Sequence, residues 1–141
     1  LAYAELGQPQ RAIQDFDEVL KLDPNNPAAY KGRGTACLNL GLEARALEDL
    51  GEALRLDPNY AEAYFTRGIA HLNRGEFQKA VADYTEAIRL NPQDAEAYAN
   101  RAMAYALLED EAATQRDQSR AVELGMDPTV LEAELKRSAE R

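Results

Sequence analysis

The chain has 141 residues, enough for one domain with a hydrophobic core. Its 16 lysines and arginines against 25 acidic residues give a net charge of -9, whereas nucleic acids and anionic membranes require a basic surface. One cysteine permits no internal disulfide, one histidine leaves little for a metal site, and no apolar run reaches the ~18 residues of a membrane span. Composition therefore predicts no cofactor, no nucleic-acid partner and no membrane insertion.

A repeat with a period of about 34 residues governs the sequence. Six residue types recur at this interval: Gly7, Gly41 and Gly75; Pro24, Pro58 and Pro92; Ala12, Ala46 and Ala80; Tyr30, Tyr64 and Tyr98; Arg33, Arg67 and Arg101; and Asp15, Asp49, Asp83 and Asp117. Agreement of so many columns at one fixed offset indicates a repeat protein.

The period divides the chain into a partial unit, three full units and a tail. In chain order we expect a partial repeat at 1–26, repeats at 27–60, 61–94 and 95–128, and a capping helix at 129–141. Leu1 aligns with Ile69, midway through a unit, and no initiator methionine is present. We therefore expect a fragment of a longer protein, with a truncated or proteolysed chain as the alternative.

Each unit is expected to form two helices. In the third unit, 61–74 has apolar residues at helical spacing and ends at Gly75, which adopts the left-handed conformation without strain. The stretch 77–90 has one broad apolar face and ends where Asn91 precedes a proline. Small residues such as Gly34 and Ala46 can let the two helices approach closely. The sequence has no period-two strand pattern, so the fold class is all-α.

This pattern resembles the tetratricopeptide repeat. The third unit contains its residues at the expected places: Tyr64, Gly68, Gly75, Ala80, Tyr84, Ala87 and Pro92. The resemblance covers nearly the whole chain. It implies a right-handed superhelical solenoid of antiparallel helix pairs, here about three and a half units and a cap, with a concave groove lined by first helices. It also implies a non-catalytic scaffold for protein binding.

The last unit departs from the pattern. Glu109 replaces the turn glycine and Thr114 the alanine, while Gln118 replaces the aromatic residue. A more polar second helix needs less cover, which is typical of the end of a repeat array. We expect a capping helix to follow, with Thr129 and Glu132 spaced for a capping box. Its apolar residues can cover the last pair of helices: Val130, Leu131 and Leu135.

Two residue patterns suggest other functions. Cys37 and His71 are a possible nucleophile and base, but they occupy the same column of successive units, too far apart for a hydrogen bond. The arginine column can bind anions, or each arginine can pair with the aspartate column. We prefer ion pairs, which predicts each arginine within salt-bridge distance of an aspartate. An enzyme is not predicted.

The candidate binding residues lie on one stripe of the first helices. They are Lys31, Thr35, Asn39, Phe65, Thr66, Ile69, Asn73, Asn100 and Met103. Amides can bond both backbone groups of an extended peptide, and the apolar members can hold side chains. Ile69, like Leu72 and Leu107, can instead belong to the packing between units.

Some family members clamp a C-terminal carboxylate with two lysines, two asparagines and an arginine. Only the first lysine is matched, by Lys31, while the other four places hold Thr35, Thr66, Glu96 and Asn100. We therefore expect a ligand that is not anchored by a terminal carboxylate.

The prediction is thus a scaffold that binds a peptide or partner protein in its groove. The alternative is a structural or self-association module of a larger protein, which forms a homo-oligomer through an open N-terminal face. A third possibility is that the acidic surface recruits a basic partner. The compartment is left open, with a preference for the cytoplasm.

Overall fold

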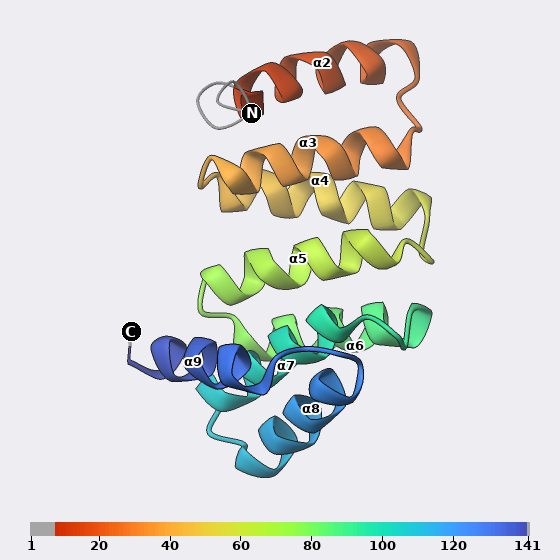
Figure 1. Cartoon of the computed structure of the whole chain (residues 1–141). Coiled ribbons are helices and arrows are strands. Elements are labelled where there is room, and N and C mark those ends of the chain that lie inside the picture. Colours follow the sequence, from red (N-terminus) through yellow and green to blue (C-terminus); the bar gives the residue numbers. More distant parts are fainter. Residues whose placement is uncertain (1–7, 141) are drawn as a thin grey trace.

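The computed structural model describes residues 8–140, and every regular element in this range is an α-helix. The prediction of an all-α fold is confirmed. The eight described helices are α2 (Gln8–Leu22), α3 (Pro27–Asn39), α4 (Glu43–Leu56), α5 (Ala61–Asn73), α6 (Phe77–Leu90), α7 (Ala95–Leu107), α8 (Glu111–Glu123) and α9 (Pro128–Ala139). Figure 1 shows them as a stack in chain order from α2 to α8, with α9 lying across the end.

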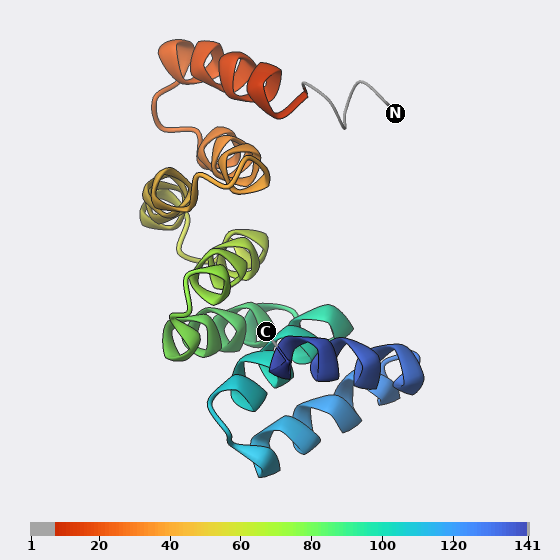
Figure 2. The same ribbon diagram turned by 90° about the vertical axis from the view of Figure 1, so that its left-hand side faces the viewer.

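The helices repeat with the period of the sequence. The first helices α3, α5 and α7 begin at residues 27, 61 and 95, and the second helices α4, α6 and α8 begin at residues 43, 77 and 111. Each first helix packs most extensively on the second helix that follows it, and each second helix packs on the next first helix. Figure 2 shows the resulting curved stack from the side. The architecture is a superhelical solenoid of antiparallel helix pairs.

The turns within the pairs use a left-handed residue. Gly41 and Gly75 follow α3 and α5 with φ of 77° and 76°, as their place in the sequence predicts. Glu109 occupies the same place after α7 and has φ of 61°. The backbone geometry is therefore kept where the glycine is lost, and the β-carbon of Glu109 makes that geometry less favourable.

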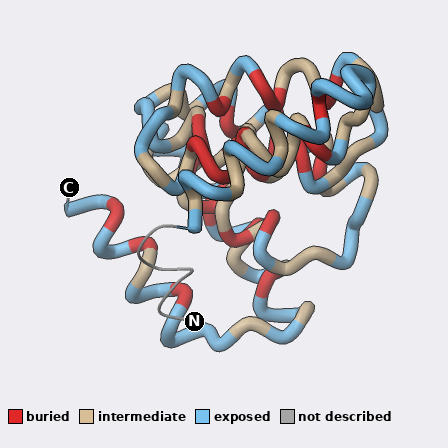
Figure 3. Tube along the Cα trace, turned by 90° about the horizontal axis from the view of Figure 1, so that it is seen from above, coloured by how far each residue is buried: buried red, intermediate tan, exposed pale blue. Residues whose placement is uncertain are grey.

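The core is a series of local clusters along the stack. One cluster joins α3, α4 and α5 around the fully buried Leu50, and another joins α6 and α7 around the fully buried Tyr84. Close packing depends on small residues, because a β-carbon at Gly68 would lie 2.6 Å from the Tyr84 ring. Figure 3 shows buried residues along the whole stack. Each cluster thus depends mainly on neighbouring helices, as in other solenoids.

The last helix differs from its prediction in two details. Asp127 is the N-cap of α9 and accepts from the backbone N–H groups of Thr129 and Val130, so the expected capping box of Thr129 and Glu132 is wrong. The helix already begins at Pro128, two residues too early for Thr129 to act as the cap. Val130 is also 50% exposed and does not cover the last pair.

Candidate protein-binding surface

The stripe predicted to bind ligands lies on α3, α5 and α7. We call this surface the first-helix face; its members are the nine candidate residues from Lys31 to Met103 named above. Asn39 and Asn73 are exposed at the same place of α3 and α5, near the ends of these helices. The Lys31 ammonium is 3.6 Å from a carboxylate oxygen of Glu62, so this ion pair joins α3 to α5. The side-chain amides of Asn39 and Asn73 are therefore accessible to a partner.

The apolar candidates on α5 are half-buried. Phe65 and Ile69 pack against the cluster of Tyr84, Ala80 and Ala104. The rings of Phe65 and Tyr84 are 5.8 Å apart between centroids and inclined by 58°, a favourable tilted contact. These side chains therefore belong to the packing between units and also present part of their surface to solvent.

The two threonines use their hydroxyl groups within their own helices. The Thr35 hydroxyl donates to the backbone carbonyl of Lys31 at 2.8 Å, and the Thr66 hydroxyl donates to that of Glu62 at 2.9 Å. Thr66 is only 8% exposed. The structure therefore places Thr66 in the packing rather than on the accessible surface, and Thr35 is half-buried.

Asn100 lies beside the buried hydroxyl group of Tyr84. The Tyr84 side chain is fully buried, and its hydroxyl has no hydrogen-bond partner of standard geometry among the described residues. Burial raises the pKa of Tyr84, while the nearby Asn100 amide opposes this shift without completing such a bond. The half-buried Asn100 is therefore oriented partly toward the interior as well as toward the face.

Met103 is half-buried beside the cluster that joins α7 to the last helix. It packs with Ala106 of α7 against the cluster that contains Leu131 and Leu135 of α9. The sequence predicted a cap over the last pair of helices, but it did not predict that the leucines of the cap would share a cluster with a candidate binding residue packed beside it. The polar sequence of α8 could have predicted this arrangement, because it leaves α7 as the more apolar surface on which α9 can pack.

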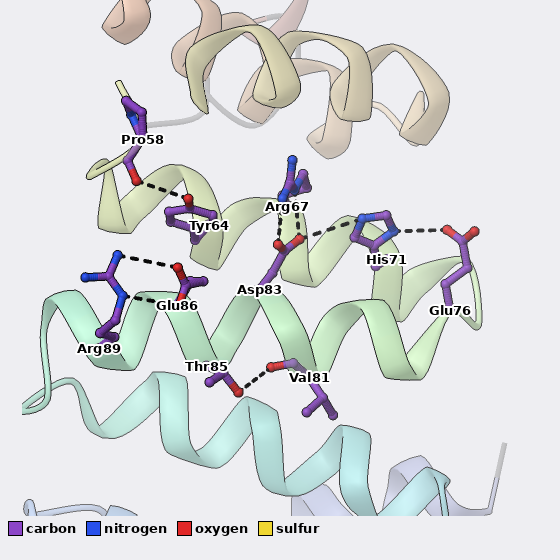
Figure 4. A network of polar contacts seen from close by, with 10 residues as sticks. All are labelled: Pro58, Tyr64, Arg67, His71, Glu76, Val81, Asp83, Thr85, Glu86 and Arg89. Atoms are coloured by element: carbon purple, nitrogen blue, oxygen red, sulfur yellow. Dashed lines mark hydrogen bonds and ion pairs between the residues drawn. The ribbon is translucent and has the colours of Figure 1, made fainter. Parts of the chain in front are cut away.

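The arginine column forms ion pairs, as predicted. Arg67 donates from Nε and Nη2 to the two carboxylate oxygens of Asp83 at 2.9 and 2.8 Å, as Figure 4 shows. Arg33 and Arg101 make the same two-point contact with Asp49 and Asp117. The hydrogen bond to the aspartate is the largest cause of the raised pKa of each arginine.

Two of these arginines have additional hydrogen-bond partners that the sequence did not predict. Arg33 also donates to Asp17 of α2 at 2.8 Å, and Arg101 also donates to the Thr85 hydroxyl of α6 at 3.1 Å. Asp15, the first member of the predicted aspartate column, is exposed instead. Asp17 and Thr85 lie two repeat periods apart and so occupy the same place in their units. This shared place is the sequence signal from which the additional partners of the arginines could have been predicted.

Cys37 and His71 have separate structural roles. Cys37 is fully buried in the cluster of α3, α4 and α5, and this burial raises the pKa of its thiol. His71 contacts Glu76 through Nδ1 at 3.1 Å and lies 3.7 Å from Asp83 through Nε2 (Figure 4). Across residues 8–140, His, Cys, Asp and Glu side chains form no group of three or more that could hold a metal ion.

Two further predictions bear on partners. In the part of the chain that the structure describes, none of the helices has the length and apolarity that crossing a membrane requires. The N-terminal face predicted for self-association includes residues 1–7, which lie outside the described residues.

Comparison with known proteins agrees with the repeat architecture. Three tetratricopeptide repeat family models match residues 1–61, 61–94 and 83–122. A search of curated proteins finds no match. A crystal structure of MamA is 28% identical, with a TM-score of 0.81 over 88% of this chain and 72% of MamA.

Two other solved structures are similar. The first TPR of Spaghetti (RPAP3), bound to the HSP90 peptide SRMEEVD, is 28% identical with a TM-score of 0.72, over 77% of this chain and 86% of that one. TTC0263, a thermophilic TPR protein of Thermus thermophilus, shares the fold at 21% identity and a TM-score of 0.79, over 99% of this chain and 77% of that one. The helix pairs, their common period and these matches show that the chain belongs to the tetratricopeptide repeat family.

Proposed function

We propose that this protein is a non-catalytic interaction scaffold that binds a peptide or a partner protein along its first-helix face. The exposed pair Asn39 and Asn73 is the observation that carries the proposal. Both amides stand at the same place of consecutive first helices, one repeat period apart, with their side chains accessible. A regular row of amides suits the regular backbone of a bound segment.

The chemistry of the face fits an uncharged backbone better than a charged group. A carboxamide both donates and accepts, so each asparagine can bond an N–H and a C=O of an extended segment. The half-buried Phe65 and Ile69 add apolar surface between the two ends of α5. Lys31 is paired with Glu62, which reduces its availability for an anionic ligand. Because packed helices hold these residues, binding needs little rearrangement.

The HSP90 peptide on the similar Spaghetti domain raises the question of a carboxylate clamp. Of the five clamp places, only Lys31 holds the expected residue, while Thr35, Thr66 and Asn100 are neutral and Glu96 is acidic. Thr66 is also buried. An exposed carboxylate at Glu96 repels a terminal carboxylate. We therefore propose a ligand that is recognised through internal backbone and apolar groups.

Paired substitutions test the proposal. The double variant Asn39→Ala and Asn73→Ala should lose partner capture in a pull-down with the array as bait, and helicity should stay unchanged. The matched control is Asn25→Ala with Asn59→Ala, because these exposed amides are also one repeat period apart but lie in the turns before α3 and α5. Equal capture by both double variants would reject the first-helix face as the binding surface.

Self-association through the N-terminal face is the alternative. Light scattering over a dilution series distinguishes the two, because a monomer at all concentrations removes self-association. A dimer that still forms after substitution of Asn39 and Asn73 would support self-association. If partner capture also stays unchanged in this double variant, the result would oppose the scaffold proposal.

A further inference from the structure

The last helix does not sit where the next repeat would place it. Of the helices that precede it, each first helix packs mainly on the second helix of the unit before, as α7 packs on α6 more than on α5. In contrast, α9 packs more on α7 than on α8. Figures 1 and 2 both show α9 lying against α7 and diverging from α8.

The contact uses two leucines on one side of α9. Leu131 and Leu135 are 2% and 8% exposed, and they lie in a cluster with Ala99 and Ala102 of α7 and Ala121 of α8. Residues four apart share one face of a helix, so these leucines form a short apolar stripe. Most of the rest of α9 is exposed, including Glu132, Ala133, Lys136 and Arg137.

The receiving surface on α7 is part of the first-helix face. Met103 occupies the place of Thr35 and Ile69, and Ala99 occupies the place of Lys31 and Phe65, at whole multiples of the repeat period. Alanines at 99, 102 and 106 leave room for another helix, and the flexible thioether of Met103 adapts to different side chains. The helix α9 therefore lies on the surface over which a ligand would extend.

The position of α9 follows from the polar outer side of α8. Val81 and Tyr84 of α6 belong to the apolar cluster that includes Ala104 of the following helix α7, but the corresponding residues of α8 are Gln115 and Gln118. A cleft of about 500 Å³ between α8 and α9 is lined by these glutamines together with Ser119 and Val122. Because α8 offers little apolar surface, α9 is held mainly from one side.

We propose that the α7 part of the first-helix face is a docking site for an amphipathic helix of a partner protein that presents two leucines four residues apart, and that α9 occupies this site as a replaceable intramolecular ligand. The inference deepens the proposed scaffold function and rests on it. The occupant is defined by α9 itself, whose seated leucines show which chemistry the alanines and Met103 accept. A partner helix binds by displacing α9, so its affinity is reduced by the local concentration of α9.

The test measures binding of a fluorescent synthetic peptide with the sequence of residues 126–140 to the full chain. Leu131→Ala with Leu135→Ala weakens the intramolecular contact and should raise the affinity for the peptide at least tenfold over the unchanged protein. The control Val130→Ala with Glu132→Ala alters exposed residues of α9 and should leave the affinity unchanged. A peptide with aspartate in place of both leucines should not bind either protein.

A second variant guards against a structural change in α7. Inserting a flexible linker of glycine and serine between Gly125 and Met126 keeps both contact surfaces and lowers the local concentration of α9. It should raise the peptide affinity at least threefold. Equal affinity of the unchanged, leucine-substituted and linker-extended proteins would overturn the inference. So would binding of the aspartate peptide.

The two proposals fail separately. Loss of partner capture in the Asn39 and Asn73 double variant, together with equal peptide affinities, would leave the scaffold function in place and reject the helix site. Tight peptide binding to the leucine variant that is abolished by Met103→Asp would support the helix site. This conclusion would not depend on whether a partner binds to α3 and α5.

Discussion

The ion pair of Arg67 and Asp83 allows a direct test of how the array is stabilised. Asp83 is 5% exposed and receives two hydrogen bonds from Arg67, whose side chain is 29% exposed and lies over the Tyr64 ring. In Asp83→Asn the charge is lost, while the amide oxygen still accepts one bond from the guanidinium. The remaining half-buried cation has lost its counter-ion, but it keeps contact with water.

The expected cost follows from this partial burial. Breaking a fully buried pair by removal of one partner costs about 3–5 kcal/mol. Because Arg67 keeps solvent contact and one acceptor, we expect Asp83→Asn to lower the free energy of unfolding by about 2 kcal/mol. Asp117→Asn should cost more, since Asp117 is 1% exposed and the Arg101 side chain 15%.

Urea unfolding followed by circular dichroism measures these losses. The exposed pair of Glu52 and Arg55 provides the control, and Glu52→Gln should cost no more than about 0.5 kcal/mol. Replacement of both partners, as Arg67→Met with Asp83→Leu, should cost less than Asp83→Asn alone because no buried charge is left. An Asp83→Asn variant as stable as Glu52→Gln would refute the reasoning.

Three other predictions concern single side chains. Because Cys37 is fully buried, its thiol should react with a disulfide reagent only as the array unfolds, and rapid labelling of the folded protein would contradict this. Glu109→Gly should raise the free energy of unfolding by about 1 kcal/mol in urea melts because it relieves the positive φ, whereas Glu109→Ala should not. The pKa of Glu76 is lowered, chiefly by its contact with His71, so this carboxylate stabilises the fold above its unfolded pKa of 4.5, and the benefit is lost as the pH falls through the lower folded pKa. The difference in Tm between the wild type and Glu76→Gln should therefore shrink as the pH falls below about 4.5, and a constant difference would argue against a lowered pKa of Glu76 in the folded protein.

Periodicity made much of the fold predictable. A contact that recurs in every unit is recorded several times in the sequence, so the turn at Gly75 and the pair Arg67 and Asp83 could be inferred without coordinates. The helix α6 has the predicted bounds 77–90 for the same reason. In each case local helix chemistry and the repeat indicate the same structure.

The binding surface was less predictable, because the repeat does not specify which candidate residues of the first helices are buried by neighbouring helices. Thr66 and Asn100 belong to one column, yet Thr66 is buried and Asn100 is half-buried beside Tyr84. The docking of α9 depends on a comparison of two surfaces, the polar α8 and the alanine-rich α7, which no single segment reveals. The cap at Asp127 was missed because Thr129 has the spacing of a capping box but lies inside the helix.

The same columns show that the interfaces between units are not equivalent. Arg33 and Arg101 each bind a side chain of the preceding second helix, Asp17 and Thr85, but the corresponding residue before Arg67 is Gly51. Within residues 8–140 the junction of α4 and α5 therefore lacks this polar tie and depends on the apolar cluster around Leu50. On the first-helix side, the pair of Lys31 and Glu62 spans α3 and α5 instead. Because neighbouring units stabilise one another in a solenoid, the strength of this junction controls how rigidly the amides of α3 and α5 are held relative to one another.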